Sequence, residues 1–345
     1  MQTQVQKFLL SIVLCALVVA LDAGPQASAQ SQPVATISVG DQPRAVVFSP
    51  DSSVAYVSHS AEATIRVVRT ADHTVIDTIT LGPTEPGYNL SGLDVTPDGE
   101  YLYVTWRARG AVVPVRTSDG AVLPEIPVCI RPLSVKVTPD GNRAYVACFE
   151  ELVMVLDTTT NTVVDQISFP SSSMIYAIDI SPDGSKAYVN DNLTIKVYVI
   201  STADNSFVDT INISFGRPHH DIAVSPDGTY VYTTATQNGA VAAIRPFDHQ
   251  VRRIDVGGGP SGIAVTPDGG YVYVSSMYTN RVSVIRTADN AVLEHIPVGR
   301  KPDGIIDISP DGHWLYVPNR DSNTVSVISV LTGTKYSAHL PLILR

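Results

Sequence analysis

The sequence contains little cysteine, little charge and no excess of positive charge. Only 3 of the 345 residues are cysteine, and neither a C-x-x-C pair nor the C-x-x-C-H segment of c-type haem attachment occurs. Charged residues make up 16% and hydrophobic residues 44%, which indicates a globular rather than a disordered chain. The net charge of −10 argues against a nucleic-acid-binding protein.

Long hydrophobic runs are absent except at the N-terminus. Residues 8–21 form a mostly apolar run after Lys7, and residues 27–29 (A-S-A) match a cleavage site. This pattern predicts a secretory signal peptide over residues 1–29 and a mature chain from about Gln30, because the run is short for a membrane span. An uncleaved anchor is the alternative. We therefore expect an exported protein in the periplasm, at the cell surface or outside the cell.

Two cysteines, Cys129 and Cys148, remain after cleavage. An oxidising compartment permits a disulfide between them, and two buried free thiols are the alternative. The eight histidines are scattered, and no H-E-x-x-H, G-x-S-x-G or phosphate-binding loop motif is present. The sequence therefore supports no catalytic residue, no metal site and no cofactor.

One segment recurs seven times, and residues 266–274 (T-P-D-G-G-Y-V-Y-V) are a clear copy. The prolines of the copies lie 41–47 residues apart, and a tyrosine stands six residues after each one. These tyrosines are Tyr56, Tyr103, Tyr145, Tyr188, Tyr232, Tyr273 and Tyr316. Seven of the 15 tyrosines thus occupy one position, which indicates a repeat architecture.

Each copy predicts a β-hairpin. Proline suits the second position of a tight turn, aspartate accepts hydrogen bonds from nearby backbone N–H groups, and glycine tolerates positive φ. The flanking segments, such as residues 262–265 and 271–274, are rich in β-branched and aromatic residues and predict strands. The seven aspartates could also form an acidic or calcium site, but turn chemistry accounts for all of them.

Two further strands follow in each repeat, as in residues 281–285 and 292–298, joined by a second tight turn. Four short antiparallel strands per repeat, seven times over, predict an all-β fold, a single seven-bladed β-propeller of residues 30–345. The last repeat lacks a clear fourth strand. We expect residues 35–39 to close the ring there, and the tail around residues 339–342 is the competing candidate.

With these motifs in view, the chain resembles the YVTN-type β-propeller repeat proteins of exported bacterial and archaeal surface proteins. The resemblance rests on the Pro-Asp-Gly turn, the Tyr-Val after it and the Val-x-Val-Ile strand, and it covers nearly all of residues 34–330. Residues 316–319 (Y-V-P-N) approach the namesake tetrapeptide, but no copy is complete. Related propellers include lactone hydrolases and cofactor-binding redox subunits, so the resemblance implies a fold rather than one function.

Two functions are consistent with the sequence. The first is a non-enzymatic binding or protein-interaction scaffold, favoured by the regular repeats. The second is a lactonase-type hydrolase, which would need acid, base and cationic groups at one mouth of the ring. We expect a monomer without a membrane span after cleavage, whose partner is a small acidic ligand, a glycan or a protein.

The connections between successive blades meet at one mouth of the ring, and they are rich in cations. They carry Arg44, Tyr88, Arg131, Tyr176, Arg217, His219, His220, Asp221, Arg300, Lys301 and Asp303. Since the guanidinium fork suits carboxylates and phosphates, we predict that Arg44, Arg131 and Arg300 hold an acidic ligand. His220 would be the acid or base if chemistry occurs. Solvated loop charges or ion pairs between blades are the alternative. A metal at residues 219–221 is disfavoured because adjacent side chains of an extended chain point to opposite sides.

Overall fold

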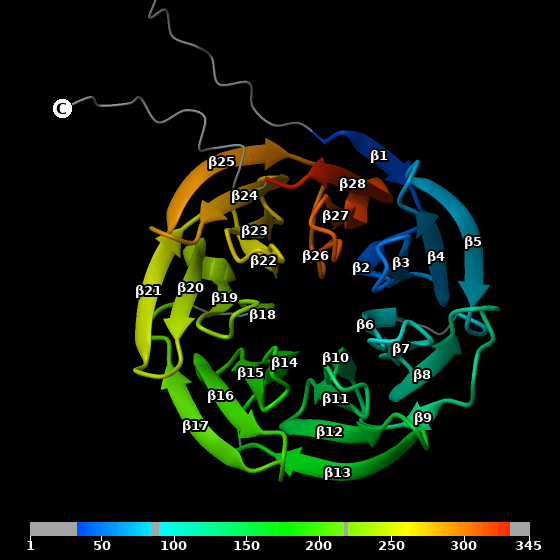
Figure 1. Cartoon of the computed structure of the whole chain (residues 1–345), viewed down its shortest axis with the longest axis horizontal. Helices are drawn as coiled ribbons and strands as arrows, with labels where there is room; N and C mark the ends of the chain where they lie inside the picture. Colours follow the sequence, from blue (N-terminus) through cyan, green and yellow to red (C-terminus); the bar gives the residue numbers. More distant parts are fainter. Residues whose placement is uncertain (1–32, 85–89, 171, 217–219, 332–345) are drawn as a thin grey trace, which may run out of the picture. The chain divides into compact units, whose positions relative to one another are not determined.

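The computed structural model describes residues 33–84, 90–170, 172–216 and 220–331. All of them belong to the unit Ser31–Arg345, one of two units into which the chain divides. This unit is the predicted propeller, with seven four-stranded antiparallel sheets around a central channel (Figure 1). No helix in the described ranges is long and apolar enough to cross a membrane. The predicted signal peptide lies outside these ranges.

The strands in chain order are β1 (Ala35–Ser38), β2 (Pro43–Phe48), β3 (Val54–His59), β4 (Thr64–Arg69), β5 (Thr74–Thr80), β6 (Leu90–Val95), β7 (Tyr101–Trp106), β8 (Ala111–Arg116), β9 (Ile126–Pro127), β10 (Pro132–Val137), β11 (Arg143–Cys148), β12 (Leu152–Asp157), β13 (Thr162–Ser168), β14 (Ile175–Ile180), β15 (Lys186–Asp191), β16 (Lys196–Ser201), β17 (Phe207–Asn212), β18 (Ile222–Val224), β19 (Val231–Ala235), β20 (Ala240–Arg245), β21 (Gln250–Asp255), β22 (Pro260–Val265), β23 (Tyr271–Ser276), β24 (Arg281–Arg286), β25 (Ala291–Pro297), β26 (Asp307–Ile308), β27 (Trp314–Asn319) and β28 (Thr324–Ser329). Two 3-10 helices, η1 (Thr236–Asn238) and η2 (Arg320–Ser322), precede β20 and β28.

The blades are numbered in chain order, so blade 1 is β2–β5 and blade 6 is β22–β25. Blade 7 combines β26–β28 with β1, which pairs antiparallel with β28 through Ala35 opposite Val327. The prediction that the N-terminal strand closes the ring is therefore confirmed. Residues 339–342 lie outside the described part of the chain.

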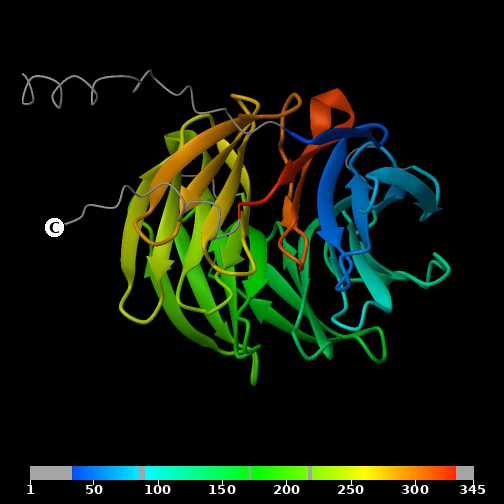
Figure 2. The same ribbon diagram turned by 45° about the horizontal axis from the view of Figure 1, so that its top comes forward.

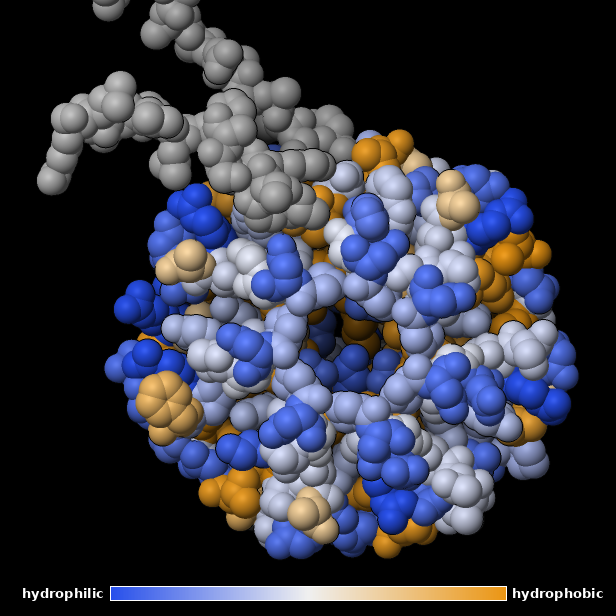
Figure 3. Space-filling view, in the orientation of Figure 1, coloured by the Kyte–Doolittle hydropathy of each residue, from blue (hydrophilic) through white to orange (hydrophobic). Residues whose placement is uncertain are grey.

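The Pro-Asp-Gly turns lie on one face of the ring, and the connections between blades lie on the other. Figure 2 shows η2 at one face and the β26–β27 turn at the opposite one. In each turn the aspartate accepts hydrogen bonds from a hydroxyl two residues earlier and an amide two residues later, as Asp98 does from Thr96 and Glu100. The turn interpretation of these aspartates is therefore supported. Figure 3 views the face that carries the Pro-Asp-Gly turns, and this face is hollowed at its centre.

The repeated tyrosines lie between blades. All seven are at most 5% exposed. The hydroxyl of Tyr103 donates to Asn161 Oδ1 at 2.7 Å, and that of Tyr145 donates to Asn205 Oδ1 at 2.7 Å, in each case in the second tight turn of the next blade. The hydroxyl of Tyr316 is 2.7 Å from His73 Nδ1 across the ring closure. The tyrosine recurs at the same position of each copy because its side chain joins one blade to the next.

Blade 2 departs from the repeat in its outer strand β9, which has only two residues, Ile126 and Pro127. Just beyond β9, a disulfide joins Cys129 to Cys148 at the end of β11, with the two Cα atoms 6.3 Å apart. This separation lies within the range that a disulfide requires. The bond ties blade 2 to blade 3 on the face where the connections meet.

Candidate functional site

A cavity of 230 Å³ opens at the mouth of the channel on the face that carries the connections between blades. Its lining residues are Arg44, Leu90, Ser91, Arg107, Tyr176, His220, Asp303 and Arg320. They come from five of the seven blades or the segments leading into them, since each inner strand delivers its first residues to this mouth. The cavity is therefore a property of the closed ring.

Ring closure brings Arg44 and Asp303 together. The amide of Ile305 donates to the carbonyl of Arg44, and the amide of Val46 donates to the carbonyl of Ile305. Gly304 permits this approach, because a Cβ there would lie 1.9 Å from the Arg44 carbonyl oxygen. The inner edges of blades 7 and 1 thus pair directly, and their charged side chains share one site.

Asp303 is held by two arginines. Arg44 Nη1 lies 2.9 Å from Asp303 Oδ1, and Arg320 Nη1 lies 2.8 Å from Asp303 Oδ2. The side chains are only 10–18% exposed, which strengthens these contacts relative to surface ion pairs. Burial alone would lower the pKa of Arg44, but Asp303 and Tyr176 raise it above its ordinary value, so the guanidinium stays charged. With Arg107 also on the lining, the cavity carries three cations and one carboxylate.

His220 and Tyr176 line the cavity beside Arg44. Their rings stack with centroids 5.0 Å apart and an angle of 21° between planes. Burial, assisted by the charge of Arg44, lowers the pKa of His220 to about 4, so the imidazole is neutral near pH 7. Its Nδ1 is buried and has no hydrogen-bond partner among the described residues. A neutral imidazole with an unpaired nitrogen can accept a proton or a hydrogen bond from a ligand.

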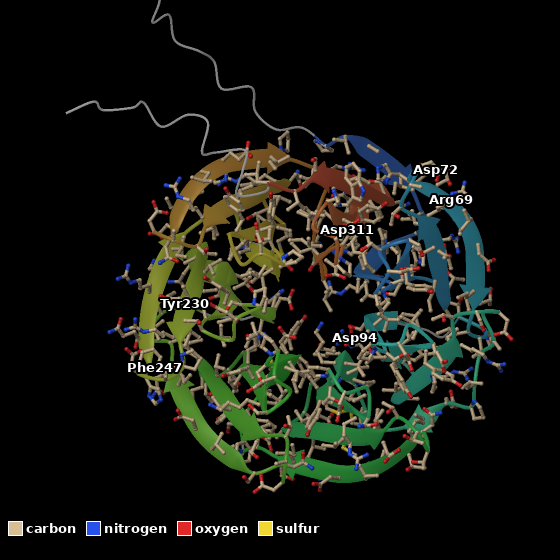
Figure 4. The ribbon with its side chains drawn as sticks, viewed as in Figure 1. Arg69, Asp72, Asp94, Tyr230, Phe247 and Asp311 are labelled. Carbon is tan, nitrogen blue, oxygen red and sulfur yellow. A yellow bond between two sulfur atoms is a disulfide. The ribbon has the colours of Figure 1, made fainter. Side chains whose placement is uncertain are left out.

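Below the mouth, a narrow space of 20 Å³ shares Arg44 and His220 with the upper cavity and also touches Asp221. It leads to a second cavity of 170 Å³, lined in part by Lys136, Asp179 and Asp307. Lys136 Nζ lies 3.8 Å from Asp179, and likewise 3.8 Å from Asp94, which Figure 4 places beside the channel. The inner strands therefore line the channel with paired charges.

The channel aspartates also join neighbouring blades. Asp94 accepts a hydrogen bond from the amide of Val137 at 2.8 Å, and Asp221 accepts one from the amide of Ile263 at 3.0 Å. Burial raises the pKa of Asp221 to about 7. Because these carboxylates accept hydrogen bonds from backbone amides of the next blade, they stabilise the contacts between blades.

The structure separates the predicted mouth residues into two groups. Arg44, Tyr176, His220 and Asp303 meet at the cavity, and Asp221 lies just below it. Arg131 instead stacks on Phe149 at 4.3 Å and lies 3.7 Å from Glu150. It therefore lies outside the cavity lining, contrary to expectation.

Arg300 also lies outside the lining, because its guanidinium donates to the carbonyl of Asp321 at 3.0 Å. The backbone amide of Lys301 donates to Asn280 Oδ1 at 2.8 Å, and Lys301 does not contribute to the lining either. Tyr88, Arg217 and His219 lie outside the described residues.

Sequence reasoning missed Arg107 and Arg320. Both follow the second strand of their blade, β7 and β27, and so belong to connections within a blade. Because these connections lie on the same face as those between blades, the sequence pattern could have placed both arginines at this mouth.

Among the described residues, no group of three or more His, Cys, Asp or Glu side chains is arranged to hold a metal ion. The residues present at the mouth offer positive charge, one carboxylate, a phenol and a neutral imidazole. This set can bind a carboxylate or phosphate and could transfer a proton at His220 Nδ1.

A family model described as "Lactonase, 7-bladed beta-propeller" matches residues 17–151 and 235–335, which is more than half of the chain. The chain belongs to the lactonase seven-bladed β-propeller family. No curated protein matches the sequence.

Solved structures agree on the fold. A chain of hydrazine synthase from Kuenenia stuttgartiensis is similar with a TM-score of 0.76 and 24% identity, covering 84% of this chain and 96% of that one. The β-propeller domain of Cps50 (Swd1) from Myceliophteria thermophila has a TM-score of 0.74 and 17% identity, covering 87% and 100%. At these identities the likeness of this lactonase-family propeller to both structures concerns the fold alone.

Proposed function

We propose that this protein is an exported propeller of the YVTN repeat type that binds a small carboxylate-bearing molecule at the mouth of its channel. The observation that carries the proposal is the cavity lined by Arg44, Arg107 and Arg320, whose single carboxylate, Asp303, pairs with Arg44 and Arg320. An anion that enters the cavity gains from charges that are already ordered, since Asp303 holds two of the three guanidinium groups in place.

The cavity size fits this assignment. At 230 Å³ it is somewhat smaller than the range of about 300–1,000 Å³ that is common for drug-sized ligands. A sugar acid or a short dicarboxylic acid is therefore a better match than a polymer. The stacked rings of Tyr176 and His220 offer a flat wall for the body of such a ligand.

The binding test uses gluconate, malate and neutral glucose as probes, measured by calorimetry. We expect the acids to bind the wild type and glucose not to bind. Arg107→Ala should weaken binding by about tenfold, because a charge-assisted hydrogen bond contributes roughly 1.5 kcal/mol. Arg131→Ala and Arg300→Ala are matched controls, because they remove the same charge from the same face outside the cavity. Equal loss in all three variants would mean that the site is not this cavity.

Lactone hydrolysis is the second candidate, and two observations favour it: the family match and the neutral His220 beside Arg44. Nδ1 of His220 would take a proton from water while the water oxygen adds to the lactone carbonyl. Arg44 would stabilise the resulting oxyanion. The ring C–O bond then breaks, the alkoxide receives the proton from His220, and the product is a hydroxy acid whose carboxylate the arginines can hold.

The two candidates differ in one measurement. Opening of D-glucono-1,5-lactone, followed by acid release and corrected for the spontaneous rate, should be accelerated by the wild type and not by His220→Gln if the protein is a hydrolase. If both proteins bind gluconate and neither accelerates opening of the lactone, only the binding function is supported.

A further inference from the structure

The opposite face of the ring carries a second cavity, between blades 5 and 6. Its volume is about 500 Å³, within the usual range for small-ligand sites. The lining residues are Ser225, Pro226, Asp227, Tyr230, Tyr232, Pro267, Asp268, Gly269, Thr287 and Ala288. They belong to two successive Pro-Asp-Gly turns and to the second tight turn of blade 6, so this cavity is separate from the mouth.

The tyrosine–asparagine hydrogen bond that joins blade 2 to blade 3 and blade 3 to blade 4 is not formed at this junction. In blades 2 and 3 the repeated tyrosine donates to an asparagine of the next blade at 2.7 Å. Asn290 occupies the corresponding position opposite Tyr232, with φ of 60° as its counterparts have. Its Oδ1 is nevertheless buried and without a hydrogen-bond partner among the described residues. Asn290 Oδ1 therefore does not accept a hydrogen bond from the hydroxyl of Tyr232.

The junction of blades 7 and 1 shows how the same space is filled elsewhere. There the ring of His73 packs edge-on against Trp314 at 4.8 Å and reaches the hydroxyl of Tyr316. At blades 5 and 6 the small side chain of Ala288 lies on the cavity lining together with Tyr230. Tyr230 stacks on Tyr232 with centroids 5.9 Å apart and an angle of 26°, which presents an aromatic wall.

The charge of this cavity has one sign. Asp227 and Asp268 contribute carboxylates, and no lysine or arginine is among its lining residues. The hydroxyl of Ser225 and the amide of Thr229 bind Asp227 Oδ1 and lower the pKa of this carboxyl, so it is ionised near neutral pH. Arg245, which touches Tyr230, is paired with Asp248 through Nε at 3.0 Å. The pair adds no net positive charge.

We propose that this cavity binds an organic cation, a guanidinium or alkylammonium group with an apolar stem. The ring of Tyr230 attracts the cation, Pro226 and Pro267 contact the stem, and Asp227 and Asp268 balance the charge. In Figure 4, Tyr230 lies in the blade of β18–β21, nearer to the channel than the exposed Phe247. The same chemistry is offered by a free amine and by an arginine side chain of a peptide.

The test titrates ethylguanidinium into the full chain and follows binding by ligand-observed NMR, with ethylurea as the neutral isostere. We expect the cation to bind and the urea not to bind. Tyr230→Ala should weaken binding by about tenfold, in line with a desolvated cation–π contact. Ala288→Trp should abolish it by filling the cavity. Both substitutions are at partly or fully exposed positions, and thermal melts would check that the fold is kept.

Tyr101→Ala is the matched control, because Tyr101 occupies the position of Tyr230 in blade 2, where the tyrosine and asparagine are bonded. It should leave binding unchanged. The proposal is overturned if ethylguanidinium does not bind, if ethylurea binds equally, or if Tyr101→Ala has the effect of Tyr230→Ala. An acetylated, amidated arginine peptide then distinguishes the sources: tighter binding than ethylguanidinium indicates a peptide ligand, and equal or weaker binding a free amine.

Discussion

Removal of one hydroxyl between blades should reveal how much the repeated tyrosine contributes to stability. Tyr145 is 1% exposed, and its hydroxyl donates to Asn205 Oδ1 at 2.7 Å and approaches the carbonyl of Thr202 at 3.4 Å. Tyr145→Phe keeps the buried ring and leaves the asparagine oxygen without its donor. Asn205 stays in place, because its Nδ2 also donates to Asp165 at 2.7 Å. The expected loss is therefore one hydrogen bond plus an unsatisfied acceptor, about 1–3 kcal/mol.

Tyr232→Phe is the matched control inside the same chain. Tyr232 is equally buried, but Asn290 Oδ1 has no partner among the described residues, so this hydroxyl does not donate to it. We expect a change below about 0.5 kcal/mol.

Urea unfolding of both variants, followed by circular dichroism, measures the difference through the midpoints, provided that the slopes stay equal. Equal destabilisation by the two substitutions would refute the assignment of the hydroxyl as the contact between blades. A double-mutant cycle with Asn205→Ala should return a coupling of about 0.5–1.5 kcal/mol for the Tyr145–Asn205 pair.

Three further predictions concern the ring as a whole. Deletion of residues 30–40 removes β1 and should lower the melting temperature sharply, because β28 loses its antiparallel partner; an unchanged melting curve would contradict closure by this strand. Reduction of the Cys129–Cys148 disulfide, which spans a sequence separation of 19, should cost about 3 kcal/mol by the chain-entropy estimate, and thiol titration of the unfolded, unreduced protein should find no free thiol from this pair. Because burial raises the pKa of Asp221 from 3.8 to about 7, the stabilisation from this carboxyl is full below the unfolded pKa and is lost as the pH rises through 7. The melting temperature should therefore fall more between about pH 5 and about pH 8 in the wild type than in Asp221→Asn, and parallel pH profiles would count against this role.

The sequence by itself determined the blade and the number of blades. Turn chemistry is local, so Pro97 and Asp98 specify their hairpin wherever the chain goes, and the period-2 alternation after it specifies a strand. Seven copies in register then leave a ring as the arrangement that buries both ends, and the surplus strand at residues 35–38 supplies the closing partner. These predictions succeeded because each depends on neighbours in the sequence.

Tertiary structure decided which side chains share a site. Arg44 and Asp303 are far apart in the chain and meet only because the inner edges of the first and last blades pair at Gly304. Arg131 lies one residue before β10, at the position of Gln42 in blade 1, and stacks on Phe149, a contact that no local pattern encodes. The junction at Tyr232 is of the same kind, because Asn290 matches Asn161 and Asn205 in sequence but its Oδ1 accepts no hydrogen bond among the described residues. Contacts across blade junctions depend on how two curved sheets pack, and the residues of one repeat do not specify that packing.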